Sequence, residues 1–372
     1  MGFEALSRFL STDGKSEAPN DVFSRYMHSN QAVDLDRICR QHGLEAYKDH
    51  HKRCPDHLLF LNFDSAIIDQ GVQGSGFLLS QVQHLGIPPD RIVLEIIESR
   101  VADVNKLLDF VQMYREIGFF IALDDVGSGY SNLERLAQIH PHIIKIDRSI
   151  ITGINDSFAK EKIFQAIIHL SHSLGALALA EGIETLEEAL TCLELGADLV
   201  QGFYFGRPKP FPYAEGPDLI TMQNMLTIYS DRYTHKTSSQ KSFLLTLESA
   251  TRSLAQKLKQ MSQTDWDFGL HRFLSSQQEI DCAYVLDTHG IQVTQTVFYH
   301  NKPETTNPLF SPSQIGADHS AKPYFLQTRR TPSFILSDSY ISLATGKVCQ
   351  TLVLPFRDSS RKSFRLCLDI SL

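Results

Sequence analysis

Short apolar runs alternate with longer amphipathic stretches through the first 205 residues, and this alternation restricts the possible folds most strongly. Apolar runs of about four to six residues, separated by helix-length segments, are typical of βαβ units and a parallel sheet. The runs that we interpret as strands are residues 3–9, 58–61, 92–94, 119–123, 143–144, 176–180 and 199–200. The pattern therefore predicts an α/β fold for this part of the chain.

A polar or charged side chain lies in or directly after each of these seven runs. The residues are Glu4, Asn62, Glu95, Asp124, Lys145, Glu181 and Gln201. In a (β/α)8 barrel the carboxyl ends of the strands converge on one face, where such enzymes place their chemistry. One such residue alone is best explained as an ordinary strand end, but seven in succession, mostly acidic, favour a common site. We therefore expect a (β/α)8 TIM-like barrel.

Composition indicates an ordinary globular protein that holds two domains. The chain has 372 residues, of which 42% are hydrophobic and 21% charged, and its formal net charge is -8. This negative charge disfavours binding to a nucleic acid polymer or to an anionic membrane. The six cysteines form no CxxC pair, and no apolar run approaches the roughly 18 residues of a membrane span. We also expect no signal peptide. We expect a cytoplasmic protein without membrane insertion.

Adjacent aspartates, Asp124 and Asp125, end one apolar run and precede the small loop Gly127-Ser128-Gly129. Neighbouring like charges repel unless a cation holds them together. With Glu4, Asn62, Glu95 and Glu181 they form a set of hard oxygen donors, which favours Mg²⁺ or Mn²⁺. Five carboxylates suit two ions about 3.5–4 Å apart, as in phosphodiester cleavage. Lys145 can position the attacking water or stabilise developing negative charge. A salt bridge that neutralises the excess acid is the alternative, and it is compatible with that role.

The motifs at these positions resemble the EAL-domain family of cyclic di-GMP phosphodiesterases from residue 2 to about residue 212. The matching segments are GFEALSR at 2–8, LEIIE at 94–98, DDVGSGYS at 124–131, IKID at 144–147, AEGIET at 180–185 and QGFYF at 201–205. The resemblance implies metal-dependent hydrolysis of one phosphodiester bond of cyclic di-GMP, which gives linear pGpG. It also implies a homodimer.

The resemblance also implies a role for each matching residue. Metal ligands would be Glu4, Asn62, Glu95, Asp124, Asp125 and Glu181, with Asp124 bridging two Mg²⁺ or Mn²⁺ ions. Lys145, Glu181 and Asp124 would act in catalysis. Arg8, Leu6 and Gln201 would contact the substrate. Glu98 would anchor the loop from Val126 to Ser131 and couple it to dimerisation.

Two departures from the family pattern carry expectations. The family has a strand before the Glu-Ala-Leu strand, whereas this sequence begins at Met1-Gly2, so the first family strand is missing and a closed barrel lacks one strand. A truncation, a misplaced start codon or a degenerate protein would each explain this. Val126 replaces the usual phenylalanine, from which we expect looser control of the loop and no loss of metal ligands.

A group of soft ligands invites a second metal site, but its spacing fits no standard pattern. The group comprises Asp49, His50, His51, Cys54 and His57. We interpret this segment as a solvated loop before a strand.

The second half of the chain has a different texture. We place the barrel at residues 1–212, a helical linker at 213–265 with helices at 219–229 and 242–262, and a β-rich α+β domain at 266–372. Residues 318–325 and 340–342 resemble a PAS- or Cache-like sensor domain of the YkuI C-terminal type. The alternative is a domain that serves dimerisation only. Arg329, Arg330 and Tyr340 could line a pocket for an unknown small anion, or lie at the surface.

Three functions remain open from the sequence. The leading one is a metal-dependent cyclic di-GMP phosphodiesterase regulated by its C-terminal domain. A receptor that binds cyclic di-GMP without hydrolysing it is the alternative, which the missing strand favours. An interaction protein built on an inactive barrel is the third, and the complete acidic set disfavours it.

Overall fold

The computed structural model describes residues 1–26, 31–64, 68–69, 76–129, 133–211, 219–299, 309–329 and 333–371. Contacts divide the chain into two compact units, Met1–Thr234 and His235–Leu372. The first contains a seven-stranded sheet and the second a six-stranded sheet. Among the described residues, no helix has both the length and the apolar character needed to cross a membrane.

The main sheet of the first unit is parallel, and its order is β1-β4-β5-β6-β7-β8-β9. Its strands are β1 (Gly2–Ala5), β4 (Leu58–Asn62), β5 (Ile92–Ile96), β6 (Phe120–Val126), β7 (Ile143–Ile146), β8 (Leu177–Ala180) and β9 (Leu199–Val200). All seven predicted strands are therefore present. The predicted α/β class is confirmed as a curled, open barrel in which β1 and β9 are the edge strands.

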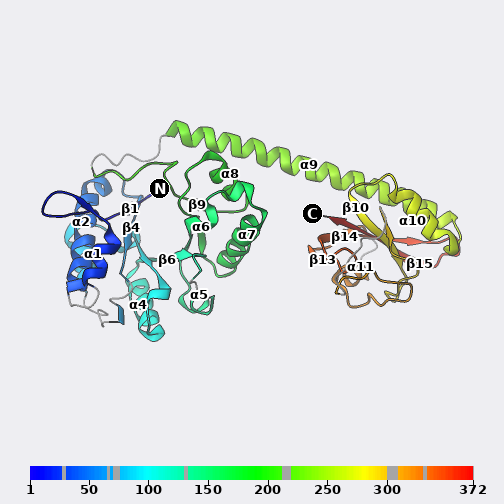
Figure 1. Cartoon of the computed structure of the whole chain (residues 1–372), viewed down its shortest axis with the longest axis horizontal. Coiled ribbons are helices and arrows are strands. Elements are labelled where there is room, and N and C mark those ends of the chain that lie inside the picture. Colours follow the sequence, from blue (N-terminus) through cyan, green and yellow to red (C-terminus); the bar gives the residue numbers. More distant parts are fainter. Residues whose placement is uncertain are drawn as a thin grey trace. The chain divides into compact units, whose positions relative to one another are not determined.

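Helices surround the strands of this unit on the outside (Figure 1). They are α1 (Pro19–Tyr26), α2 (Gln31–Arg53), α3 (Phe77–Leu85), α4 (Val104–Ile117), α5 (Leu133–Ile139), α6 (Arg148–Ile151), α7 (Phe158–Ser173) and α8 (Leu186–Glu194). A two-stranded ribbon, β2 (Phe9–Leu10) with β3 (Ser16–Glu17), follows β1. The helices cover the outer face, so the inner face alone is left for a site at the strand ends.

The strands alternate their side chains between two apolar layers. One residue from each of five strands forms an inner cluster of Phe60, Val93, Ala122, Ile143 and Leu179. Their sequence neighbours pack outward among the helices. Because side chains in a strand alternate with a period of two, a residue two positions after an inner residue also faces inward.

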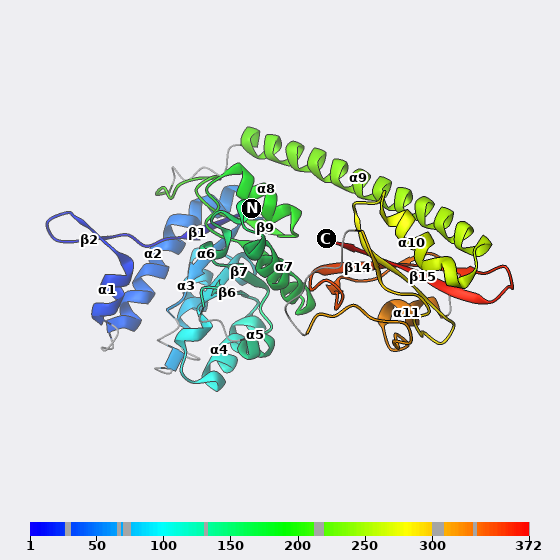
Figure 2. The ribbon, with the colours of Figure 1, turned by 45° about the vertical axis from the view of Figure 1, so that its right-hand side comes forward.

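The second unit is an α+β domain around an antiparallel sheet. Its strands are β10 (Ile280–Leu286), β11 (Val297–Phe298), β12 (Ile335–Leu336), β13 (Tyr340–Ile341), β14 (Val348–Arg357) and β15 (Ser363–Ser371). Helix α10 (Trp266–Leu274) packs on one face with the end of α9 (Leu219–Gln260), and α11 (Pro323–Thr328) packs on the other (Figure 2). The predicted β-rich texture is present, while the sensor class of the domain stays a prediction.

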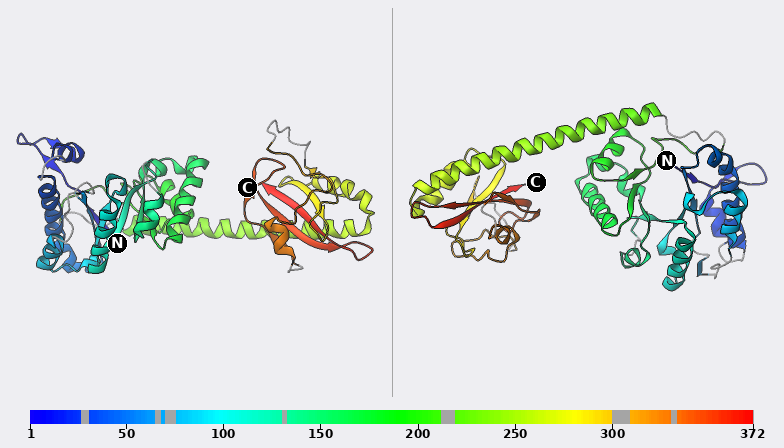
Figure 3. Two further views of the ribbon diagram at one scale, coloured as in Figure 1. Left: turned by 90° about the horizontal axis from the view of Figure 1, so that it is seen from below. Right: turned by 180° about the vertical axis from the view of Figure 1, so that it is seen from behind.

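The two helices predicted between the units are one helix, α9 (Leu219–Gln260), of 42 residues (Figure 3). Residues 230–241 are polar but contain neither glycine nor proline. The apolar period weakens there, yet nothing in the backbone interrupts the helix. The boundary between the two units, after Thr234, falls within α9.

Candidate active site

The polar strand-end residues gather at the carboxyl ends of the curled sheet. Glu95, Asp124 and Lys145 each come two positions after an inner residue of β5, β6 or β7, and Glu181 does so directly after β8. The strand period therefore directs all four side chains to the inner face. Glu95, Asp124 and Lys145 are buried. The predicted convergence is what the structure shows for these residues.

A local irregularity of β6 brings Asp125 to the same place as Asp124. In a regular strand these neighbours would point to opposite faces. The pairing of β6 with β7 shifts register between Leu123 and Val126, and Asp125 has a φ of 59°. Bulges of this kind redirect side chains beside active sites. Ligand oxygens of Asp124, Asp125 and Glu181 consequently lie within 4.8 Å of one another.

Lys145 lies at the centre of the acids and is 1% exposed. Its Nζ is 2.5 Å from Glu95 Oε1, 2.5 Å from Glu181 Oε1 and 3.2 Å from Asp124 Oδ1. The salt-bridge interpretation of Lys145 therefore describes its contacts. The same contacts fix its ammonium group among the acids, so the catalytic role that the sequence also predicts is compatible with them.

The two edge strands meet at this end of the sheet through side chains. Glu4 of β1 accepts a hydrogen bond from Asn62 Nδ2 at 3.0 Å, and a short one from Gln201 Nε2. Gln201 directly follows β9, the opposite edge. The Glu4 carboxylate thus links both edges of the open barrel at the site.

Burial and like charge shift the acid–base equilibria of the site. Burial raises the pKa of Glu95 well above its usual value, and raises that of Glu181 to about 8, with Lys145 acting against both shifts. Burial and then the Asp124 charge raise the pKa of Asp125. Burial alone would lower the pKa of Lys145, but the surrounding carboxylates raise it well above its usual value.

These residues fit divalent cations. Five carboxylates, those of Glu4, Glu95, Asp124, Asp125 and Glu181, surround one ammonium group. Glu95 Oε2 is buried and accepts no hydrogen bond from the residues that the structure describes. Carboxylate oxygens are the ligands of hard cations, and excess buried charge requires protonation or a cation. Glu4, Glu95, Asp124, Asp125 and Glu181 could hold such ions, with Asn62 beside them.

Other predicted site residues lie less centrally. Arg8 and Leu6 are exposed on the segment after β1, and Arg8 Nη1 donates to the Ser7 carbonyl at 2.9 Å. The backbone of Glu98 begins a 3-10 turn, Glu98–Arg100, but its side chain lies outside the described residues. Of the loop after Asp125, residues 130–132 also lie outside them. Val126 is buried at the end of β6.

Asp147 is a site neighbour that the sequence analysis missed. Its charge opposes ionisation of Asp125, and its carboxylate caps α6 by accepting from Ser149 N at 3.0 Å. Its position two residues after Lys145, at the end of β7, was the available signal.

In the second unit, Tyr340 is half-buried and its hydroxyl pairs with that of Thr351 at 2.5 Å. Arg330 lies outside the described residues.

The interpretation of residues 49–57 as a solvated loop is wrong for residues 49–53, which belong to α2, whereas residues 54–57 do form a turn before β4. Helix α2 continues to Arg53, His51 is buried, and His50, Cys54 and His57 converge. The helix period was readable in the sequence, but a turn after the helix, which returns His57 to His50, was not.

Comparison with known sequences places this site in a family context. Residues 1–208 match the EAL domain family. The EAL-domain protein YkuI of Bacillus subtilis is 26% identical over 371 residues, which is 96% of this chain and 88% of that protein. A probable cyclic di-GMP phosphodiesterase of Escherichia coli, PdeB, is 27% identical over 210 residues, covering 56% of this chain and 40% of PdeB.

Solved structures agree in fold. The YkuI structure, in complex with cyclic di-GMP and calcium, covers 100% of this chain and 92% of its own, with a TM-score of 0.79 and 23% identity. The EAL enzyme Bd1971, bound to cAMP and cyclic di-GMP, covers 56% of this chain and 58% of its own, with a TM-score of 0.52 and 27% identity. Because the matched residues 1–208 make up more than half of the chain, the chain belongs to the EAL domain family.

Proposed function

We propose that this chain hydrolyses one phosphodiester bond of cyclic di-GMP to give linear pGpG, with divalent cations as cofactors. The observation that carries the proposal is the acid cluster around Lys145, in which ligand oxygens of Asp124, Asp125 and Glu181 lie within 4.8 Å of one another. PdeB, a relative, is named a probable cyclic di-GMP phosphodiesterase, and Bd1971 was solved with cyclic di-GMP bound.

Two Mg²⁺ or Mn²⁺ ions are the proposed cofactors. Glu4, Asn62, Glu95 and Asp124 would hold one, and Asp124, Asp125 and Glu181 the other. Bound ions of this kind lower the pKa of water and stabilise negative charge on a phosphate. The bulge at Asp125 supports this assignment because it supplies a second aspartate to one site.

The remaining polar side chains hold and orient the reactants in this proposal. The pKa of Lys145 is raised well above its usual value, so its ammonium group stays charged. It would stabilise a developing negative charge and donate a hydrogen bond to the attacking water. Gln201 and Arg8 would bind the nucleotide, with Leu6 as an apolar contact. Gln201 is held by Glu4, which keeps its amide at the rim of the acid cluster.

The second unit is proposed to regulate this activity as a sensor domain within a homodimer, with Glu98 anchoring the loop after Asp125. Helix α9 supports the proposal because one continuous helix carries residues of both units. In this proposal the barrel is residues 1–212, the linker 213–265 and the regulatory domain 266–372.

The proposal is tested on the full chain with cyclic di-GMP and Mg²⁺ or Mn²⁺, with pGpG followed by chromatography. Asp124→Asn removes a shared ligand and should lower turnover at least about a hundredfold, the usual cost of one electrostatic group. The matched control is Glu187→Gln, because Glu187 pairs with Arg232 at the surface of α8, and it should keep wild-type turnover. Binding of cyclic di-GMP without pGpG in either metal would instead identify a receptor.

A further inference from the structure

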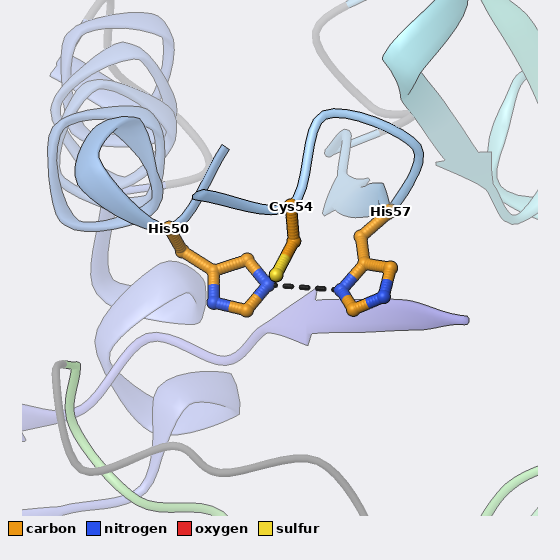
Figure 4. A group of neighbouring side chains, drawn as sticks. All are labelled: His50, Cys54 and His57. Carbon is orange, nitrogen blue, oxygen red and sulfur yellow. Dashed lines mark hydrogen bonds between the residues drawn. The ribbon is translucent and has the colours of Figure 1, made fainter. Parts of the chain in front are cut away.

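Three soft ligands converge in the first unit away from the acid cluster (Figure 4). His50 Nε2 lies 3.0 Å from His57 Nδ1, and the ligand atoms of His50, Cys54 and His57 all lie within 4.8 Å of one another. Figure 4 shows both rings and the sulfur directed toward one point. All three side chains are half-buried.

The backbone enforces this convergence. His50 and Cys54 are four residues apart, and Cys54 N donates to the His50 carbonyl at 2.9 Å, so both side chains lie on one side of the α2 C-terminus. A tight turn follows, in which His57 N donates to the Cys54 carbonyl at 3.2 Å. The buried Tyr47 hydroxyl then donates to the His57 carbonyl at 2.8 Å. These bonds bring His57 back to the helix end.

The geometry resembles that of a metal centre more than that of three unrelated side chains. Two nitrogens at Zn–N distances of 2.0–2.1 Å in a tetrahedron are about 3.3 Å apart. The observed 3.0 Å between the two imidazoles is close to this value, and it also allows an ordinary hydrogen bond. Cys54 favours a metal centre over a simple hydrogen bond between the two imidazoles, because a hydrogen-bonded histidine pair needs no thiol beside it.

The surroundings select a soft cation. The nearest rings are apolar or aromatic: His50 is 4.7 Å from Phe3 and 5.5 Å from Phe211, measured between ring centroids. The neighbouring acids are exposed and paired elsewhere, Asp49 with Lys52 and Asp56 with Arg91. Imidazole and thiolate ligands without carboxylates favour Zn²⁺ over Mg²⁺.

We propose that His50, Cys54 and His57 bind a Zn²⁺ ion, with a fourth position open to water or another ligand. On binding, the Cys54 thiol releases its proton to solvent and the sulfur bonds to the ion as a thiolate. The site is separate from the acid cluster, since His57 precedes the first residue of β4 whereas Asn62 is the last. It would tie α2 to the start of β4, beside Phe3 of the edge strand that carries Glu4.

The test uses Co²⁺ as a spectroscopic substitute for Zn²⁺ on the full chain, in excess Mg²⁺ to occupy the carboxylates. One equivalent of Co²⁺ should give the visible bands of a tetrahedral ion and a thiolate charge-transfer band, both lost on adding Zn²⁺. Cys54→Ser should abolish the charge-transfer band. Cys39→Ser, on the helix that precedes Cys54, is the matched control for the cysteine and should keep the band. His42→Gln is the matched control for His50→Gln: it should keep the tetrahedral Co²⁺ spectrum, which His50→Gln should lose. A spectrum without a Cys54-dependent band would overturn the proposal.

A second measurement, of thiol alkylation, uses the wild-type chain and so does not require any variant to fold. Cys39 and Cys54 are both half-buried free thiols, so each can be followed by alkylation and mass spectrometry. Zn²⁺ should slow alkylation of Cys54 at least tenfold, reversibly with a chelator, and leave Cys39 unchanged. Equal rates at Cys54 with and without Zn²⁺ would refute the site.

Discussion

Lys145 is buried among carboxylates that outnumber it, so its charge stabilises the folded first unit in addition to its proposed role in catalysis. Replacing it by methionine leaves Glu95 and Glu181 without their ion-pair partner at 2.5 Å. Removing one partner of a buried pair typically costs about 3–5 kcal/mol. We expect Lys145→Met to lower the free energy of unfolding by that order, with part of it restored by Mg²⁺, and to abolish turnover.

Lys145→Arg separates charge from position in the same assay. Arginine keeps the positive charge but not the compact ammonium group. It should retain most of the stability, measured by thermal unfolding with and without Mg²⁺, and still lose turnover. Full turnover in Lys145→Arg would show that only the charge matters.

Asp125 combines a charge and an unusual backbone, and two substitutions distinguish them. Its φ of 59° is tolerated by asparagine but costs alanine about 1 kcal/mol. Asp125→Asn should weaken binding of Mn²⁺ while keeping the stability of the metal-free protein, because a repelling charge next to Asp124 is removed. Asp125→Ala should weaken Mn²⁺ binding equally and also be less stable. Calorimetric titration and denaturant unfolding measure the two effects, and equal stability of both variants would contradict the backbone argument.

The inward-facing site residues could be predicted from sequence because each follows an apolar strand by a fixed period. Asp124, Lys145 and Glu181 needed only that period to be placed together. Asp125 was predicted in the site because it adjoins Asp124 and matches the family motif, but the bulge that places it there depends on strand pairing, which a period cannot indicate. The convergence of His50 and His57 was missed for the same reason, because a turn between them decides it.

At the scale of elements, the loops after β8 and β9 cross at Gly202. A Cβ at this position would lie 2.1 Å from the Ile183 carbonyl oxygen and 2.3 Å from its nitrogen. Both are backbone atoms, so no side-chain movement relieves the clash. Gly202→Ala should displace Gln201 from Glu4, lower the stability of the first unit by about 1–3 kcal/mol and reduce turnover.

Gly206→Ala is the matched control for that variant. A Cβ at Gly206 would meet nothing within 4 Å. We expect wild-type thermal unfolding and wild-type pGpG formation from it. If both alanine variants behave alike, the crossing of the two loops does not position Gln201.

The elements themselves were predictable where apolar periodicity is strong. All seven strands of the first sheet coincide with apolar runs of the sequence. One exception is the end of α2, which was interpreted as a loop, and another is α9, whose middle is polar and was interpreted as a break. Helix continuity depends there on the absence of glycine and proline, a weaker signal than periodicity.

At the scale of the whole molecule, the two units can be observed separately. Trp266 is the single tryptophan of the chain and is buried in the second unit, so its fluorescence reports that unit's unfolding. Turnover of cyclic di-GMP reports the first. Mn²⁺ should therefore protect turnover against heating and leave the transition of Trp266 unchanged, if the proposed cation site lies in the first unit alone. A matching shift of the fluorescence transition would show that the units unfold together.

Asp369 should give the second unit a pH dependence of its own. It is buried, and it accepts hydrogen bonds from Thr351 Oγ1 at 2.9 Å and Ser342 Oγ at 3.3 Å. Burial raises its pKa to about 6. Between the unfolded value near 3.9 and this folded value, the folded state binds the extra proton, so the contribution of Asp369 to stability is greatest below about pH 4 and is lost as the pH rises to about 6. Two pKa units correspond to roughly 3 kcal/mol.

Asp369→Asn removes that titration while keeping an acceptor for the same hydroxyls. We expect the thermal unfolding midpoint of the wild type, followed by Trp266 fluorescence, to decrease as the pH is raised from 4.5 to 6.5. The midpoint of Asp369→Asn should change much less over this range. Asp338→Asn, at an exposed acid of the same unit, should follow the wild type and serves as the control. A wild-type slope in Asp369→Asn would assign the pH dependence to another group. If the slope disappears, one buried carboxylate makes the second unit less stable near neutral pH than in acid, while the acids of the first unit respond to cations instead.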